Sequence, residues 1–351
     1  MTKTRIDYQG KEVHVGIDVH KKTYAIYCLY EGQLVKKATV PAVPLGLVEV
    51  FGKYFPGAQI RSAYEAGFAG FVLHRSLVAH GIGNIVVNPA SIEVAANDKV
   101  KTDKRDCQKI AVQLAAGRLK AIFVPSEERE QQRLLSRTRE QLVNERTRLG
   151  QQFKSRLYQF GYIAFDNNSV LSQKFMDGFL KMKLAEPLKQ SLSTIYKIWK
   201  FVNDEIKSLE KKMSEQAKSD KNEIVYRSVP GIGPISSRIL SNELGDMSQF
   251  RNERALFSHT GMTPSEFSSG PNRRLGHITR QGSSRLRWIM TEAAWQAIRQ
   301  DQKLAKDFER ISLKAGKKKA IVAIARKLIG RIRACFRKGQ TYELSFGLAV
   351  A

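Results

Sequence analysis

"EVHVGIDVHKKTYAIYCLY", residues 12–30, is the stretch that decides the fold of the first third of the chain. Two runs rich in valine, isoleucine and tyrosine flank a short polar turn, which is the pattern of two strands joined into a hairpin. Further strand-like runs, "QIRSAY", "NIVVN" and "KAIFVP", alternate with the helix-like segments "GFVLHRSLVAHG" and "KRDCQKIAVQLAAGRL". A hairpin followed by alternating helices and strands predicts an α/β layer fold with a mixed sheet over residues 11–125.

Residues 126–222 change to a helical pattern. Ser126 followed by two glutamates indicates a helix start, because a serine caps the helix and acids suit its first turn. Farther on, eight apolar residues are spaced alternately by four and three positions: Leu188, Leu192, Ile195, Trp199, Val202, Ile206, Leu209 and Met213. This heptad seam predicts a coiled-coil-like pair of long helices, antiparallel in one chain or paired between chains, with an ordinary bundle core as the alternative. We expect this region to serve dimerisation.

Residues 223–340 indicate a mainly α domain. "SVPGIGPISSRILSNELG" places Gly231 and Gly233 in a tight turn between helix-forming segments, where backbone N–H groups can bind a phosphate. "PGIG" before a helix resembles the helix-hairpin-helix motif. From residue 311 to 340 there are ten Lys or Arg residues and no acid, which predicts a helix with a basic face toward nucleic acid. The candidate contacts there are Lys317, Lys318, Lys319, Arg326, Arg331 and Arg333.

The charge of the whole chain points to a polyanionic partner. There are 59 Lys or Arg residues against 33 Asp or Glu, so the net charge is +26 and the pI is near 10. Nucleic acid is the expected partner, because basic groups release counterions from phosphates. The longest apolar runs fall short of a membrane span, so we expect no membrane. Three widely separated cysteines form neither a disulfide framework nor a zinc site, which favours a reduced, cytoplasmic setting.

Four carboxylates in the first region have positions that suggest a site. Asp18 lies within an apolar strand, and Glu65 lies at the end of another. Asp103 and Asp106 are three residues apart at a predicted helix start, so they share a face. Carboxylates brought together repel unless a cation neutralises them, and Mg²⁺ prefers such oxygen ligands. Each acid also has a plainer interpretation: Asp18 could lie on the solvated face of its strand, Glu65 could be a surface residue, Asp103 could cap the helix, and Asp106 could pair with Lys109.

"FSSGPNRRLGHITRQGSSRLR", residues 267–287, combines two adjacent serines with five arginines and no acid. A serine hydroxyl is a weak nucleophile unless a base, a metal or strong electrostatic help activates it. From these residues alone, a phosphate-binding loop whose serines only donate hydrogen bonds is the favoured interpretation. The arginines that would bind phosphates are Arg273, Arg274, Arg280, Arg285 and Arg287.

The order of these motifs resembles a known family. The four acids resemble the Asp-Glu-Asp-Asp set of RuvC-like nucleases, which have a ribonuclease-H-type fold. The series "GIDVHK", "YEAG", "KTDKRD", "VPGIGP", "HTGMTP", "FSSG" and "RLGHITRQGSSRLR" closely resembles the IS-one-hundred-and-ten family of insertion-sequence transposases. The resemblance implies that Asp18, Glu65, Asp103 and Asp106 bind Mg²⁺ or Mn²⁺. It also implies a serine nucleophile, which we place at Ser269 with Ser268 as the alternative.

The same resemblance implies the partners and the reaction. They are the DNA of the element ends and target, and a structured guide RNA encoded by the element. The expected activity is recombination through a covalent phosphoserine–DNA link, by a prokaryotic, nucleoid-associated protein. About 160 residues and the heptad helices separate the acids from the serines, which allows a dimer or tetramer with sites shared between chains. Two alternatives remain: a junction nuclease that uses water as nucleophile, and a scaffold that binds nucleic acid without catalysis.

Overall fold

The computed structural model describes residues 6–93, 103–164, 171–269, 272 and 274–344 of the 351-residue chain. For Asp103, Lys104 and Leu275 it describes the backbone path alone. The chain divides into two compact units, Met1–Pro125 and Ser126–Ala351. The boundary predicted at residue 222 falls inside the second unit.

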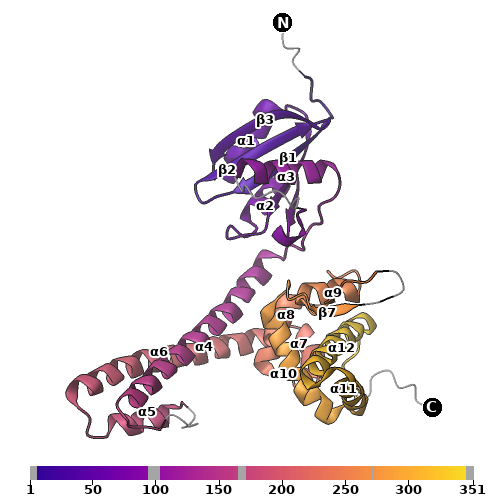
Figure 1. Cartoon of the computed structure of the whole chain (residues 1–351). Coiled ribbons are helices and arrows are strands. Elements are labelled where there is room, and N and C mark those ends of the chain that lie inside the picture. Colours follow the sequence, from indigo (N-terminus) through magenta and orange to yellow (C-terminus); the bar gives the residue numbers. More distant parts are fainter. Residues whose placement is uncertain (1–5, 94–102, 165–170, 270–271, 273, 345–351) are drawn as a thin grey trace. The chain divides into compact units, whose positions relative to one another are not determined.

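The first unit is built on a five-stranded mixed sheet (Figure 1). Its strands are β1 (Glu12–Val19), β2 (Thr23–Tyr30), β3 (Gln33–Pro41), β4 (Gln59–Glu65) and β5 (Gly83–Val87), in the spatial order β3-β2-β1-β4-β5. The pairs β1–β2 and β2–β3 are antiparallel, whereas β1–β4 and β4–β5 are parallel. The structure therefore confirms the α/β layer with a mixed sheet and the hairpin of residues 12–30.

Two expectations for this sheet need correction. The strand β3 was not predicted, because its lysines hide the alternating pattern of a sheet edge. The segment "KAIFVP" was predicted as a last strand, but it forms only an isolated bridge between Val87 and Ala121. Pro125 ends the first unit directly after it.

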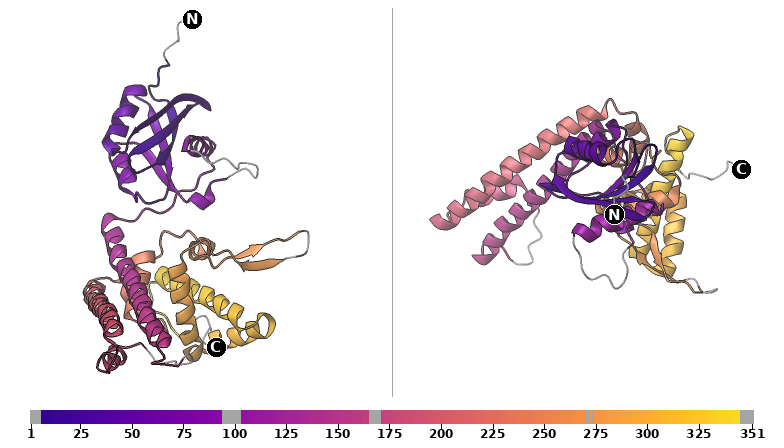
Figure 2. Two further views of the ribbon diagram at one scale, coloured as in Figure 1. Left: turned by 60° about the vertical axis from the view of Figure 1, so that its left-hand side comes forward. Right: turned by 90° about the horizontal axis from the view of Figure 1, so that it is seen from above.

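Helices cover both faces of the sheet. Helices α1 (Pro44–Tyr54) and α2 (Val72–Ala79) lie on one face and α3 (Asp103–Ala115) lies on the other, as the turned view of Figure 2 shows. Alternate residues of β1 explain the two layers. Val13, Val15 and Ile17 are buried in the core that contains α1 and α2, whereas Gly16, between them, faces α3.

The second unit begins with two long helices, α4 (Glu127–Gln159) and α6 (Glu186–Ala217), with the short α5 (Gln173–Leu180) between them in the chain. They pack antiparallel within one chain: Arg139 contacts Glu210, whereas Arg156, farther along α4, contacts Ser191, which comes earlier in α6. The heptad seam of α6 is its inward face. Seven of its eight residues are buried, and Leu209 is half-buried.

The rest of the second unit is a helical domain with one small hairpin. Its elements are α7 (Asn222–Arg227), α8 (Pro234–Leu244), α9 (Glu253–Thr260), the strands β6 (Pro264–Glu266) and β7 (Leu275–Ile278), α10 (Ser284–Gln300), α11 (Gln302–Ala315) and α12 (Lys317–Lys338). One hydrophobic core joins these helices to Met213 at the end of α6. The helical pair and the C-terminal helices are therefore packed as one body.

A buried carboxylate connects three helices of this unit. Glu243, in the last turn of α8, has a side chain only 8% exposed. Its oxygens accept hydrogen bonds from Arg137 of α4 at 3.0 and 3.1 Å and from Arg285 of α10 at 3.0 Å, and Arg133 of α4 lies 3.7 Å away. Burial by itself raises the pKa of Glu243, but the three arginines outweigh it and lower the pKa.

Arg129 and Arg133 complete this junction. They donate to the backbone carbonyls of Ser241, Asn242 and Glu243 at the end of α8, where a helix runs out of its own amide donors. The Ser241 carbonyl also accepts from the Gly245 amide. Positive charge is also favourable at the negative end of a helix. The first two turns of α4 are thereby fixed to the C-terminus of α8.

Replacing Glu243 by glutamine should destabilise the protein strongly. The variant leaves three guanidinium groups without their shared carboxylate, so the free energy of unfolding should fall by roughly 3–5 kcal/mol. Urea unfolding measures it. Glu145→Gln is the matched control, because Glu145 pairs with Arg148 on the exposed side of α4 and should change the free energy of unfolding by less than about 1 kcal/mol. Equal losses in the two variants would contradict the role given to Glu243.

The same carboxylate gives a signed pH dependence. Because folding lowers the pKa of Glu243, its stabilisation is complete above the unfolded pKa of about 4.3 and disappears as the pH falls through the folded pKa. Glu243→Gln cannot titrate at this position. Its free energy of unfolding should therefore decline less steeply below pH 5 than that of the unaltered chain.

Candidate active site

Asp18 and Glu65 lie side by side at one edge of the first unit. Ile17 of β1 pairs with Tyr64 of β4, and these two strands are parallel, so Asp18 and Glu65 are the next residues on each strand. Register partners in a parallel pair point to the same face. Asp18 also pairs with Ala25, which belongs to the cluster packed against α3. Both carboxylates thus project on the face that α3 covers.

Helix α3 lies unusually close to this face because β1 has a glycine there. A Cβ added at Gly16 would lie 1.9 Å from the carbonyl oxygen of Cys107 and 2.6 Å from the amide nitrogen of Ala111. Burial, followed by the negative charge of Asp18, raises the pKa of the Cys107 thiol to about 11, which is consistent with Asp18 lying beside the start of α3. Asp106 immediately precedes Cys107.

The described acids also have basic side chains as neighbours. His20 Nε2 lies 3.2 Å from an Asp18 carboxylate oxygen, and Lys109 Nζ lies 3.8 Å from Asp106 Oδ1. The pair between Asp106 and Lys109 is the plainer contact that the sequence also predicted. The pair spans one turn of α3, and the Asp106 side chain is 18% exposed.

The donor set suits a hard divalent cation, because carboxylate oxygens are the ligands that such ions prefer. Asp18, Glu65 and Asp106 supply three carboxylates from β1, β4 and α3, whereas the Asp103 side chain is outside the described part of the chain. Among the side chains that the structure describes, there is no cluster of three or more His, Cys, Asp or Glu residues close enough together to hold a metal ion.

The two candidate serines lie at the end of the β6–β7 hairpin. Ser268 Oγ donates to Glu266 Oε1 at 2.8 Å and accepts from the Arg274 amide at 3.1 Å. Ser269 is bridged through its backbone to Asn272, and its hydroxyl is exposed, with no hydrogen-bond partner among the described residues. Sequence reasoning missed Glu266, the last residue of β6, although it lies only two residues before Ser268.

Structure divides the predicted phosphate-binding residues into two groups. Arg274, Arg280, Lys317, Lys318 and Lys319 are exposed, and Arg273 lies outside the described residues. The others have partners within the protein. Arg326 lies over the Phe257 ring at 4.5 Å, and Arg287 donates to the carbonyls of Thr260 and Gly282.

Three of those arginines are internal and correct the sequence prediction. Arg285 pairs with Glu140 and Glu243, Arg331 pairs with Asp301 at 2.8 Å, and buried Arg333 donates to the Phe250 carbonyl at 2.8 Å. The sequence correctly indicates that this region is rich in basic residues. These three side chains, however, make their contacts inside the second unit. Their partners come from distant segments, which the local sequence does not reveal.

The two glycines of the "PGIG" turn also differ. Gly231 has a φ of +83°, and a Cβ there would lie 2.7 Å from the Ala293 carbonyl of α10, so it is needed for close packing. Gly233 is the N-cap residue of α8, is exposed, and has open space around its Cα. Both glycines are exposed, but of the two it is Gly233 that has open space where a side chain would be.

Comparison with known proteins places these features in a family. Residues 225–309 match a family model described as "Transposase IS116/IS110/IS902 family", and residues 15–161 match a transposase domain model named for the DEDD acids and IS110. The chain belongs to the IS110 family of transposases. This transposase is an enzyme of DNA transposition and recombination, and transposase domains of the DEDD type generally depend on a divalent metal ion.

Relatives from several bacteria support the assignment. A putative transposase of Sinorhizobium fredii is 27% identical over 81% of this chain and 72% of its own length. The transposase of element IS1533 from Leptospira borgpetersenii is 27% identical over 82% of this chain and 85% of its own length. That of IS1111A from Coxiella burnetii is 26% identical over 77% and 76%. Within the described residues, this transposase has no helix with the length and apolar character needed to cross a membrane.

Gly16→Ala should separate α3 from the sheet. The added methyl group would collide with the backbone of Cys107 and Ala111, which cannot move without displacing the helix that carries Asp106. We expect a loss of several kcal/mol in the stability of the first unit, as for other overpacked sites. Thermal unfolding measures it. Gly52→Ala in α1 is the control, because open space surrounds Gly52 and alanine favours a helix. A melting temperature unchanged by Gly16→Ala would disprove the close contact.

Proposed function

We propose that this transposase is an RNA-guided DNA recombinase of a mobile insertion sequence, with a serine of the β6–β7 hairpin as nucleophile. The observation that carries the proposal is the exposed hydroxyl of Ser269 at the end of that hairpin, in a segment that also exposes Arg274 and Arg280. A hydroxyl in this position can approach a phosphodiester of DNA, while arginines stabilise the charge that develops on the phosphoryl oxygens.

The chemistry conserves the phosphodiester bond energy. The serine Oγ–P bond forms as the P–O bond to the departing DNA strand breaks, and the serine proton ends on the departing DNA hydroxyl. Attack of a second DNA hydroxyl on the phosphoserine then releases the serine and joins the new strands. Because each step exchanges one phosphodiester for another, rejoining needs no ATP.

We infer that Asp18, Glu65 and Asp106 hold the divalent ion, Mg²⁺ or Mn²⁺, and that Asp103 completes the set by its place in the family motif. Bound there, the ion would polarise the scissile phosphate and stabilise the leaving oxygen. The protein's own part is positional. Two adjacent parallel strands fix Asp18 and Glu65 on one face, and the contact of α3 with Gly16 sets the distance of Asp106. The sheet with this acid set supports a ribonuclease-H-type (RuvC-like) domain.

The different surroundings of the two serines favour Ser269 over Ser268. The Ser268 hydroxyl is used within the hairpin, where it donates to Glu266 and accepts from the Arg274 amide. These two bonds hold the turn in shape. Ser269, with its exposed hydroxyl, can attack without breaking them. Ser268 therefore has a positioning role in the proposal.

Several surfaces support contact with nucleic acid. Lys317, Lys318 and Lys319 are exposed at the start of α12, and the backbone of Gly233 begins α8 as it would in a helix-hairpin-helix. We propose that these groups bind phosphates of the DNA or of the structured guide RNA that the family resemblance implies. We further propose that the α4–α6 pair serves as a coiled-coil-like dimerisation region, and that the acids of one chain act with the serine of another.

Ser269→Ala should abolish the covalent protein–DNA adduct and lower strand cleavage by at least about 100-fold, because the variant lacks the attacking oxygen. Denaturing gels of labelled DNA incubated with Mg²⁺ measure both. Ser265→Ala is the matched control in the same hairpin, where the hydroxyl only donates to the His277 carbonyl. If Ser269→Ala and Ser268→Ala each still cleave and no adduct is seen with the unaltered protein, water is the nucleophile.

Mixing inactive chains tests the sharing of sites. Asp18→Asn and Ser269→Ala should each be inactive alone, since one removes a metal ligand and the other removes the nucleophile. In a mixed oligomer with shared sites, some sites contain both intact groups, so we expect recombination to recover to roughly a quarter of the level seen without substitutions, by random assortment of two chains. A mixture that stays as inactive as either variant would show that each site comes from one chain.

A further inference from the structure

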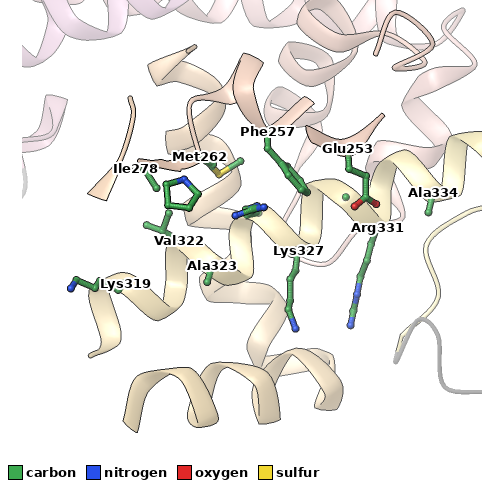
Figure 3. Close-up of a pocket in the computed structure, with 13 residues that line it drawn as sticks. Glu253, Phe257, Met262, Ile278, Lys319, Val322, Ala323, Lys327, Arg331 and Ala334 are labelled. Atoms are coloured by element: carbon green, nitrogen blue, oxygen red, sulfur yellow. The ribbon is translucent and has the colours of Figure 1, made fainter. Parts of the chain in front are cut away.

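A pocket of about 570 Å³ lies at the base of the hairpin that carries Ser268 and Ser269 (Figure 3). Three elements enclose it: α9, the two strands of the hairpin, and α12. Its volume is in the range of roughly 300–1,000 Å³ that is typical of small-molecule sites. Neither the carboxylates of the first unit nor the serines line it.

The interior of the pocket is apolar and contains an aromatic ring. Phe257 and Met262 are buried, and Ile278 and Val322 are half-buried. Figure 3 shows them around the pocket, Phe257 from α9, Met262 from the segment that follows α9, Ile278 from β7 and Val322 from α12. The Arg326 guanidinium lies over the Phe257 ring at 4.5 Å from its centroid. Both groups are planar and polarisable, and a flat aromatic ligand stacks favourably on such surfaces.

The charged residues that line the pocket are placed so that they suit a ligand with a phosphate group. Lys327 and Arg331 are directed to α11, where they pair with Asp307 at 2.5 Å and Asp301 at 2.8 Å. Lys319, at one end of the pocket in Figure 3, is exposed. Lys319 and Arg326 both line the pocket and add positive charge to it, whereas Glu253 is the one acid among the lining residues. An apolar, aromatic interior with a lysine at one end matches a nucleotide, whose base is flat and whose phosphate is anionic.

The pocket is continuous with the proposed nucleophile. Pro264, the first residue of β6, and Ile278, the last residue of β7, both line it. These strands pair directly, and the serines follow β6 within five residues. Whatever fills the pocket therefore contacts both ends of the hairpin that positions Ser269.

We propose that this pocket binds one unstacked nucleotide of the nucleic acid on which the transposase acts. The base lies in the apolar interior against Arg326, the phosphate contacts Lys319, and the occupied pocket holds the hairpin in place. An unpaired base can be extruded from a strand at modest cost, and its stacking on protein groups repays that cost. The inference rests on the proposed function for its biological setting, but the binding can be measured without any cleavage.

Equilibrium binding of short oligonucleotides to the full chain tests the pocket. The probes are a thymidine trinucleotide and an abasic trinucleotide with the same number of phosphates. Their affinity ratio isolates the contribution of the bases. We expect the thymidine probe to bind about tenfold more tightly, as base stacking on protein surfaces would give. A uridine trinucleotide tells whether the DNA strand or the RNA is preferred by the same pocket.

Two variants and one control localise the effect. Arg326→Ala removes the stacking surface and Val322→Trp fills the pocket, so each should reduce the affinity ratio to about one. Lys306→Ala on α11 removes the same single charge outside the pocket, so it should weaken both probes equally and preserve the ratio. Thermal unfolding verifies that each variant is folded. If one of the two pocket variants does not fold, the affinity ratio of the other tests the proposal.

A ratio near one with the unaltered chain would overturn the proposal, as would a high ratio that persists in both folded variants. Neither result depends on Ser269, because the trinucleotides are bound and not cleaved. Conversely, loss of the serine mechanism in the adduct assay would leave the binding ratio unchanged. The two proposals therefore fail separately.

Discussion

The second unit depends on the carboxylate of Glu243 and the three arginines around it. Removing these charges from water is costly, and the mutual contacts must offset that cost, so the arrangement fixes geometry more than it adds net stability. Arg133 and Arg137 come from the first turns of α4, and Arg285 comes from the first turn of α10. Because α10 begins soon after the hairpin returns, the junction that holds α4 on α8 also fixes the helix into which the serine hairpin leads.

In the first unit the corresponding constraint is the absence of a side chain. Gly16 lets the backbone of α3 touch β1, and this contact places Asp106 next to the face that carries Asp18 and Glu65. The two constraints are different in kind, since one is electrostatic and the other steric. Each fixes a helix against the element that bears the proposed chemistry, and neither takes part in that chemistry.

The sequence predicted the features that depend on local patterns. The hairpin of residues 12–30 and the buried seam of α6 follow from alternation and heptad spacing. Asp18 and Glu65 were each assigned to a strand, and these two strands are neighbours in the sheet. Contacts that depend on tertiary packing could not be predicted from the sequence. Arg285, Arg331 and Arg333 carry the same local signal as surface cations, yet acids or carbonyls at least thirty residues away hold them inside. The lysines of β3 similarly concealed an edge strand.

The hairpin of β6 and β7 projects Ser269 away from the point where the hairpin joins the helices. Strands rise about 3.3 Å per residue, so Ser269, five residues beyond Pro264, stands roughly 16 Å from the root of the hairpin. A tilt of about 4° at the root then moves Ser269 by about 1 Å, which is the scale of misplacement that decides whether a nucleophile can react. In the proposed serine mechanism, a small movement at the root of the hairpin would therefore be enough to bring Ser269 into or out of a reactive position.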